Sequence, residues 1–345
     1  MTLAQREADV LSTIIESYIS TAMPVGSRAV AGASHLGLSA ASMRNTMADL
    51  TDKGYLDQPH SSAGRVPTAK AFRVYVETML QPRLLPRQER TAMLSHLTRQ
   101  GLELNHMLQQ ASAMVSTLSH QVAFVLAPGG SDVRWRRIDF SLLADRLILA
   151  VLVLDGGMVR NRVVRTDEDV PPDDLIRFGN YLNSHYTGLT LAEVRARIRH
   201  ELQCTQTDIA CLRLRATELA RLAFHDDTDE ERQIYMDGTR TLLDQAEFAD
   251  AEKMRDLLHL LEERSRLLRL LENTMRGTDV SICIAPEEDA GLAALSVISA
   301  PFGGDRAQGA VSVIGPLRMD YRTVVPVVDC ISKSLSALLK DRFSA

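Results

Sequence analysis

The chain has 345 residues, a formal net charge of −5 and 45% hydrophobic residues, which excludes wholesale disorder and argues against a protein that coats nucleic acid along its entire surface. At ~100–200 residues per domain, this length predicts two or three domains. The longest apolar run, 147–154, is far shorter than the ~20 residues that a transmembrane helix needs, so we expect no membrane span.

Cysteine usage and the first residues of the chain bear on its compartment. The four cysteines form no CxxC pair and are too few for a disulfide framework; they are Cys204, Cys211, Cys283 and Cys330. Residues 1–10 lack the basic stretch followed by an apolar one that marks a secretory signal. We therefore expect a reduced, cytoplasmic chain.

The first 90 residues are set apart by their charge and their prolines. They hold ten Lys and Arg against eight Asp and Glu, whereas the remaining 255 residues hold 29 against 36. Pro82 and Pro86 predict a linker at the end of this segment. A mildly basic segment on an acidic body is the distribution expected of one small DNA-binding module within a larger protein.

Three helices are predicted at the start of the chain. Apolar residues over 11–19 share one face of the first helix, which ends before Pro24. A second, short helix is expected over 28–35 and a third over 39–53. The turn that joins them contains Gly37. Two short helices joined by a glycine-containing turn indicate a helix-turn-helix.

The third helix has an apolar face and a polar face. Met43, Met47 and Leu50 recur at i, i+4 and i+7 and are expected to face the core. Arg44 and Asn45 point the other way, toward the major groove of a bound duplex. Arg can grip guanine and Asn adenine through paired hydrogen bonds, which makes these two residues the predicted base readers.

Small side chains on this helix suit a close approach to DNA. Its alanines let the backbone come near the bases, and its serines suit phosphates or base edges. The predicted DNA contacts of the helix are Ser39, Ala41, Ser42, Arg44, Asn45 and Ala48. Spacing alone leaves open a second interpretation, in which Arg44 only pairs with Asp49 or bonds within its own domain.

A hairpin is predicted after the third helix. Two short strands within 55–68 flank the loop 60–64, whose small donors suit a phosphate or the minor groove. In the helix that follows, Lys70 and Arg73 are expected to contact the DNA backbone or to stay solvated, and His60 has the alternative of being an ordinary surface histidine. The predicted contacts of this wing and its flanks are Arg28, His60, Ser61, Ser62, Gly64, Arg65, Lys70 and Arg73.

The rest of the chain predicts an α+β body. Regularly spaced apolar residues over 94–118 indicate one long helix packed on its own domain, and 121–165 is expected to form antiparallel strands. Residues 171–277 are mainly helical, and strands return over 280–316, which indicates a helical insertion in an α+β domain. The predicted domains are 1–85 for DNA binding, 88–170 together with 278–345 for the α+β domain, and 171–277 for the insertion.

No catalytic or metal-binding constellation stands out. The carboxylates within 226–231 lack EF-hand spacing, and the chain has no HExxH, GxSxG or Walker sequence. The glycines within 303–309 suit a hairpin turn better than a phosphate cradle. We expect no enzymatic activity, no cofactor and no metal. The aliphatic strands after Gln121 favour a filled core, and a regulator that senses a small molecule stays as the alternative function.

Several long runs carry a family resemblance. The N-terminal ones are PVGSR (24–28), LSAASMRNTMADL (38–50), GYLDQPHSSAGRVPT (54–68) and FRVYVE (72–77). Later runs in the same order are RIDF (137–140), YLN (181–183), GLTLAEVR (188–195) and IGPLRMDY (314–321). Through these runs the chain resembles, over nearly its whole length, the HrcA family of bacterial heat-inducible transcription repressors.

The resemblance implies an architecture and a set of partners. The fold would be an N-terminal winged helix-turn-helix and a GAF-like α+β domain with an inserted, mainly helical dimerising domain. A homodimer would bind double-stranded DNA at the inverted-repeat CIRCE operator of chaperone operons, and would be nucleoid-associated when bound. The GroE chaperonin would keep it active until heat diverts the chaperonin to unfolded proteins. The residues themselves leave open whether heat acts on the repressor directly.

This chain departs from the family pattern at a few positions of the predicted recognition helix. Ala40 stands where the family usually has Pro, Ser42 and Met43 stand for Thr and Ile, and Thr46 stands for an acidic residue. Loss of a proline from the first helical turn removes a residue that is preorganised for a helix start. These departures bear on the choice of operator sequence.

Overall fold

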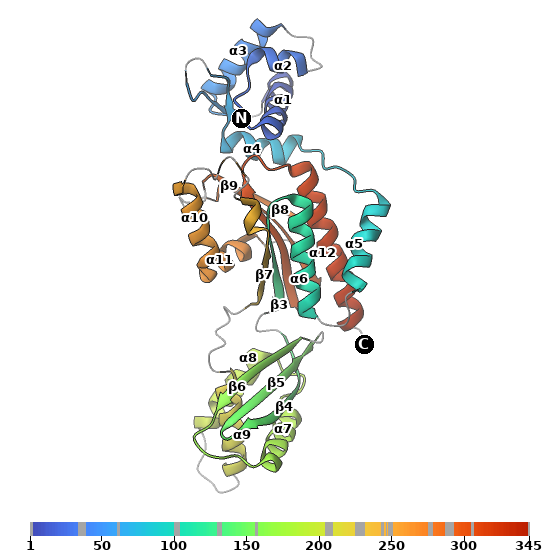
Figure 1. Cartoon of the computed structure of the whole chain (residues 1–345), viewed down its shortest axis with the longest axis vertical. Helices are drawn as coiled ribbons and strands as arrows, with labels where there is room; N and C mark the ends of the chain where they lie inside the picture. Colours follow the sequence, from blue (N-terminus) through green and yellow to red (C-terminus); the bar gives the residue numbers. More distant parts are fainter. Residues whose placement is uncertain are drawn as a thin grey trace.

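Three units are stacked along the long axis of the molecule in the computed structural model, which has an α+β architecture (Figure 1). An N-terminal unit lies at one end, a central unit in the middle, and a unit inserted into the central one at the other end. Of the helices that the structure describes, none has the length and apolar character to cross a bilayer. The described residues are 3–33, 39–60, 63–99, 104–129, 133–155, 158–203, 210–224, 232–242, 245, 247, 251–274, 279–286, 293–304 and 307–343.

The N-terminal unit consists of helices and one short antiparallel strand pair. Apolar residues of its first and third helices form its core, and Leu11, Ile14, Met43 and Leu50 are fully buried. The predicted helices and hairpin are confirmed. The elements are α1 (Gln5–Thr21), α2 (Ser27–Ala33), α3 (Ala40–Asp52), β1 (Leu56–Asp57), β2 (Val66–Pro67) and α4 (Ala69–Val74), which continues in a π-helical turn (Tyr75–Met79).

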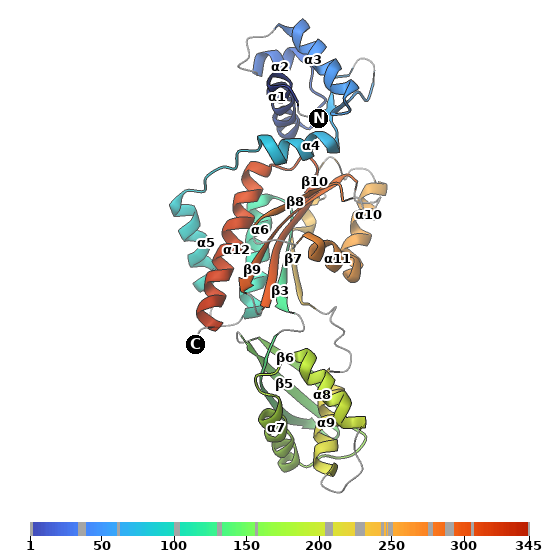
Figure 2. The same cartoon turned by 180° about the vertical axis from the view of Figure 1, so that it is seen from behind.

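The central unit is built on a five-stranded antiparallel sheet in the order β7-β3-β10-β9-β8. Helices α6 and α12 cover one face and α10 and α11 the other (Figures 1 and 2). Because both faces are covered, β3 is buried without interruption from Val122 to Ala127. Its strands are β3 (Val122–Gly129), β7 (Ile234–Asp237), β8 (Ser281–Ile284), β9 (Leu295–Gly304) and β10 (Ala307–Pro316).

The region predicted as one helix over 94–118 contains two helices. In place of one helix over 94–118 the structure has α5 and α6, and the residues between them, 100–103, are outside the described part. The sequence has Gly101 there, and glycine weakens a helix interior. Helix α6 packs on its own sheet, as predicted. The helices are α5 (Arg87–Arg99), α6 (Leu104–Ser119), α10 (Ala251–Glu262), α11 (Arg264–Thr274) and α12 (Tyr321–Phe343).

The inserted unit leaves the central sheet after β3 and returns to it at β7. It is a three-stranded antiparallel sheet in the order β4-β5-β6, with three helices packed on one face. Buried and half-buried side chains alternate along β5, and on β6 the side chains that face away from the helices are exposed, so the opposite face of this sheet is open. The elements are β4 (Trp135–Ala144), β5 (Leu147–Leu154), β6 (Val159–Arg165), α7 (Pro172–Tyr186), α8 (Leu191–Gln203) and α9 (Ala210–Phe224).

This arrangement differs from the domain boundaries drawn from the sequence. The sequence places the strands up to residue 170 with the central domain, but β4, β5 and β6 pair only with one another. It places 171–277 in the insertion, but α10 and α11 pack on the central sheet and β7 is an edge strand of it. Strand patterns report which side of a strand is buried and not which sheet it joins, so the sequence offered no boundary at residue 133.

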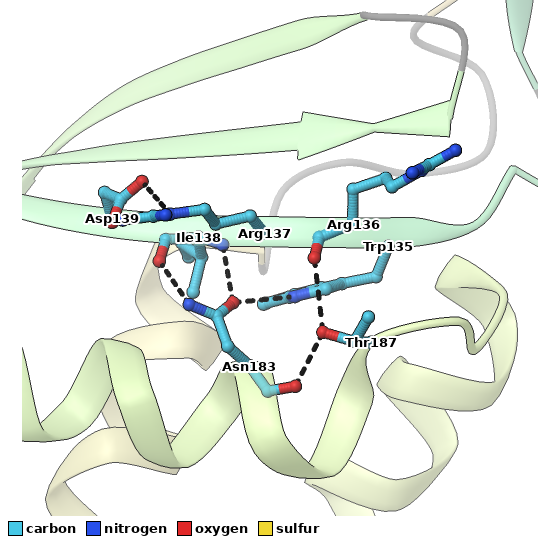
Figure 3. A network of polar contacts seen from close by, with 7 residues as sticks. All are labelled: Trp135, Arg136, Arg137, Ile138, Asp139, Asn183 and Thr187. Atoms are coloured by element: carbon cyan, nitrogen blue, oxygen red, sulfur yellow. Dashed lines mark hydrogen bonds and ion pairs between the residues drawn. The ribbon is translucent and has the colours of Figure 1, made fainter. Parts of the chain in front are cut away.

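Asn183 ties the helical layer of the inserted unit to its sheet (Figure 3). From α7, its Oδ1 accepts hydrogen bonds from the Ile138 backbone N–H at 2.7 Å and the Trp135 indole N–H at 3.3 Å, and its Nδ2 donates to the Ile138 carbonyl at 2.9 Å. Thr187 adds a bond to the Arg136 carbonyl at 3.2 Å. One amide thus satisfies both backbone groups of a buried strand residue, which explains the Asn of the YLN run.

Candidate DNA interface

The outward face of α3 carries the two predicted base readers. Arg44 and Asn45 are exposed, as are Ala41 and Ala48. Met43, Met47 and Leu50 on the opposite face are buried, as predicted. Neither Arg44 nor Asn45 has a side-chain hydrogen bond or ion pair with any residue that the structure describes, Asp49 included. The alternative in which Arg44 pairs with Asp49 is therefore not the observed arrangement.

The two serines of this helix have partners inside the protein. The Ser39 Oγ accepts a hydrogen bond from the Ser42 backbone N–H at 3.2 Å and so caps α3. The Ser42 Oγ accepts from an Arg6 guanidinium nitrogen at 2.6 Å, and Thr46 Oγ1 accepts from the same nitrogen at 3.2 Å. Arg6 thus joins α1 to α3, a role that the sequence did not reveal because its partners lie about forty residues away.

The hairpin is joined to the loop before α2. Val25 and Arg65 exchange backbone hydrogen bonds of 2.9 and 2.8 Å and so form an isolated antiparallel bridge next to β2. A Cβ atom on Gly64 would lie 2.6 Å from backbone atoms of Val25 and 2.7 Å from Pro24. Gly64, predicted as a DNA contact, therefore has a packing role as well. His60 and Arg28 are exposed, whereas Ser61 and Ser62 lie outside the described residues.

Two basic residues beside the hairpin are anchored on the C-terminal part of α3. The Arg65 Nε donates to Thr51 Oγ1 at 3.1 Å. The Lys70 Nζ donates to the Lys53 carbonyl at 2.8 Å and lies 4.5 Å from the centre of the Tyr55 ring. These contacts hold both positive charges on the same side of the unit as the end of α3.

Arg73 has a structural role that differs from the predicted one. Its Nε donates to the Ile284 carbonyl and a terminal nitrogen to the Ala285 carbonyl, each at 3.1 Å. Nearby, the Phe72 ring packs against Tyr321, with ring centres 6.3 Å apart. Arg73 therefore joins the N-terminal unit to the central unit. No local sequence pattern predicts this contact, because its partners lie more than 200 residues further along the chain.

An ion pair joins the ends of α1 and α3. The Lys53 Nζ lies 2.7 Å from both carboxylate oxygens of Glu7. These hydrogen bonds hold the pKa of Glu7 below its ordinary value of 4.5, with partial burial acting in the opposite direction. The pair keeps the start of α1 against the end of the exposed helix, and so helps to fix the orientation of α3.

Comparison with known proteins shows the family. The model described as "HrcA protein C terminal domain" matches residues 105–325. The heat-inducible transcription repressor HrcA of Nitratidesulfovibrio vulgaris (strain DSM 19637 / Miyazaki F) is 52% identical over 99% of this chain and 98% of the relative. That of Geobacter sulfurreducens is 40% identical over 98% of each chain. The chain belongs to the HrcA family of heat-inducible transcription repressors.

Membership in the HrcA family makes the chain a transcription repressor and not an enzyme. The relatives cover the N-terminal unit as well as the body, so this holds for the full length. A solved structure titled "Crystal structure of a hypothetical protein at 2.2 A resolution" has the same fold over 98% of both chains, with a TM-score of 0.61 and 22% identity. The exposed face of α3 is thus the candidate DNA-binding surface of an HrcA-family repressor.

Proposed function

We propose that the N-terminal unit is a winged helix-turn-helix and that α3 is its recognition helix. The observation that carries this proposal is the exposed pair Arg44 and Asn45, on a helix whose opposite face is the core of the unit. Their guanidinium and amide groups suit guanine and adenine edges in the major groove. Ala41 and Ala48 beside them leave room for the helix to approach the bases.

The hairpin serves as the wing in this proposal. Its tip, 60–64, and the nearby charges of Arg28, Arg65 and Lys70 would contact phosphates or the minor groove and set the position of α3. If they do, substitution of Arg65 should lower the dependence of operator affinity on salt, because each phosphate contact releases counterions. If operator affinity of the Arg65 variant depends on salt as steeply as that of the parent, the wing does not contact the DNA.

The repressor acts as a homodimer in this proposal, with the open face of β4-β5-β6 as its interface. Two cross-strand pairs on this face are apolar, Leu149 with Val163 and Val153 with Val159, and a mixed pair, Val151 with Asn161, lies between them. Val159 is 50% and Val163 54% exposed. A second copy would cover this patch and form an isologous contact, the usual symmetry of soluble dimers. We also propose that the central unit is a GAF-like domain.

The proposed target is the inverted-repeat CIRCE operator upstream of chaperone operons. A symmetric dimer reads two half-sites that lie an integral number of helical turns apart, ~34 Å each. We further propose that the GroE chaperonin keeps the repressor active and that heat relieves repression when the chaperonin is diverted. Operator affinity measured against temperature, with and without chaperonin, separates this route from direct heating of the repressor.

A gel-shift assay tests the core of the proposal. The full chain should bind a duplex that carries an inverted-repeat chaperone operator, and a scrambled duplex of the same composition should compete poorly. Equal affinity for the two duplexes at moderate salt would contradict sequence-specific recognition by α3, since phosphate contacts alone do not discriminate between them.

A further inference from the structure

A cavity of about 360 Å³ lies where the inserted unit meets the central unit. This volume is at the small end of the range that binds small ligands, ~300–1,000 Å³. One wall comes from α6, the end of β3, the segment before β7 and the start of α11, and the other from β5 and β6. A molecule bound there would touch both units at once.

Four arginines line this cavity. Arg160 and Arg162 come from β6, Arg232 from the segment before β7, and Arg264 from the start of α11. Arg160 and Arg162 are two residues apart on one strand and therefore lie on the same face of it. Among the residues that the structure places in the lining, none is Asp or Glu. The cavity therefore concentrates positive charge in a protein whose net charge is negative.

Arg232 shows where an acceptor would bind. Its Nη1 is buried and makes no hydrogen bond with any described residue. Its Nε lies 3.8 Å from a Glu272 carboxylate oxygen, and the side chain is 17% exposed. Arg264 donates from Nη2 to the Arg232 carbonyl at 2.9 Å, which holds a second guanidinium close by. A buried cationic donor without an acceptor is unfavourable, and an anionic ligand would satisfy it.

We infer that this cavity binds a small anion that carries two linked phosphate groups. Guanidinium groups pair with phosphate oxygens through two parallel hydrogen bonds, and four of these groups line the cavity. A diphosphate offers enough oxygens and charge to engage arginines of both walls. Inorganic pyrophosphate and the diphosphate of a nucleotide share this chemistry. Binding joins β6 of the inserted unit to Arg232 and Arg264 of the central unit.

Calorimetric titration of the full chain with pyrophosphate, ADP and orthophosphate tests this inference. Pyrophosphate is expected to bind saturably and more tightly than orthophosphate, and to raise the melting temperature as a ligand of the folded state does. Tighter binding of ADP than of pyrophosphate would assign a nucleotide as the source, and the reverse order an inorganic one. Both results support a diphosphate site.

Variants from the two walls locate the site. Arg264→Gln and Arg160→Gln should each weaken pyrophosphate binding about tenfold, since each removes a charge-assisted hydrogen bond. Arg269→Gln is the matched control, because Arg269 is exposed on α11 outside the cavity. Melting temperatures without ligand show that each variant is folded.

Two results would overturn the inference. One is the absence of binding in the full chain, as expected if the carboxylates within 226–231, next to Arg232 in the sequence, already neutralise the cluster. The other is pyrophosphate binding that Arg264→Gln and Arg160→Gln leave as tight as Arg269→Gln does.

Discussion

Arg44 and Asn45 are the residues through which α3 would read base pairs, because their polar groups have no described partner inside the protein. Replacing either by Ala should weaken operator binding by ~1–3 kcal/mol, the usual value of one bidentate base contact. Gel shifts with the operator and with random DNA measure the effect. Equal weakening on both duplexes would make these residues phosphate contacts, which carry no sequence information.

Gly64 is required by the close approach of the hairpin to the loop before α2. In Gly64→Ala the new methyl group would meet the Val25 and Pro24 backbones at 2.6–2.7 Å, so one segment must shift and the Val25–Arg65 bridge weakens. We expect a loss of about 1–3 kcal/mol in unfolding free energy, measured by denaturant unfolding. Gly26→Ala is the control, since nothing lies within 4 Å of its Cβ position. Equal effects of the two changes would contradict this account.

The Glu7–Lys53 pair gives the N-terminal unit a pH dependence. Because the folded state lowers the pKa of Glu7, the pair stabilises the fold above its ordinary value of 4.5, and this contribution is lost as the pH falls through the lowered pKa. Melting temperatures of Glu7→Gln should therefore fall less steeply with acid than those of the parent. Glu77→Gln, an exposed carboxylate on the π-helical turn, should keep the parental slope.

Asn183 matters at the scale of a whole element, since it holds α7 on β4 (Figure 3). In Asn183→Ala the Ile138 N–H and carbonyl, on the edge strand β4, lose their partner. We expect the inserted unit to lose about 2–3 kcal/mol of stability, because buried polar groups are left without hydrogen bonds. Hydrogen exchange of β4 amides measures it, and Ser184→Ala, an exposed neighbour on the same helix, is the control. Unchanged exchange protection of the β4 amides would show that the Asn183 hydrogen bonds do not stabilise the inserted unit.

The sequence predicts which neighbouring strands pair, but it does not predict how the strands divide between sheets. The sequence predicts the antiparallel pairing of β5 with β6 and of β9 with β10 through the turns between them, and the structure confirms both. It does not predict the two separate sheets, because β3 and β5 are both continuous apolar runs. Helices cover both faces of β3 but only one face of β5, so the apolar side chains on the other face of β5 are only half-buried.

The sequence predicts some residues of the candidate interface correctly and misses the contacts of others. The outward face of α3 follows from helical periodicity, so the exposure of Ala41, Arg44, Asn45 and Ala48 was predictable. The partners of Arg6 and Arg73 were not, because their contacts join segments far apart in the chain. A basic residue in the sequence can contact DNA or bond to another part of the protein, and its type alone does not distinguish the two.

The whole molecule links its two ends through the central unit. Arg73 and the Phe72–Tyr321 contact fasten the N-terminal unit to one end of that unit, and an ion pair between Arg322 and Glu16 adds to the junction. The inserted unit lies at the opposite end (Figures 1 and 2). If two copies join through the inserted units, the distance between their α3 helices depends on the full length of both chains. The spacing of the two operator half-sites that the dimer can bind then depends on the geometry of both junctions in each chain.

The open face of β4-β5-β6 decides the oligomeric state if it is the dimer surface. In Val163→Asp a carboxylate would replace an exposed apolar side chain of the edge strand β6 on that face, and burial of an unpaired charge is strongly unfavourable. We expect the dimer dissociation constant to rise at least ~30-fold, which corresponds to about 2 kcal/mol. Sedimentation of the full chain over a range of concentrations measures this constant.

Ile176→Asp is the matched control for the dimer surface. Ile176 is 62% exposed on α7, on the helical side of the same unit, so a carboxylate there should leave the dimer intact. Val163→Asp should also weaken operator binding, because a monomer engages one half-site at a time and loses the effective concentration that a linked second reader supplies. Dimers of Val163→Asp as tight as those of the parent would move the interface to another surface, while weakened dimers in both variants would indicate general damage to the inserted unit.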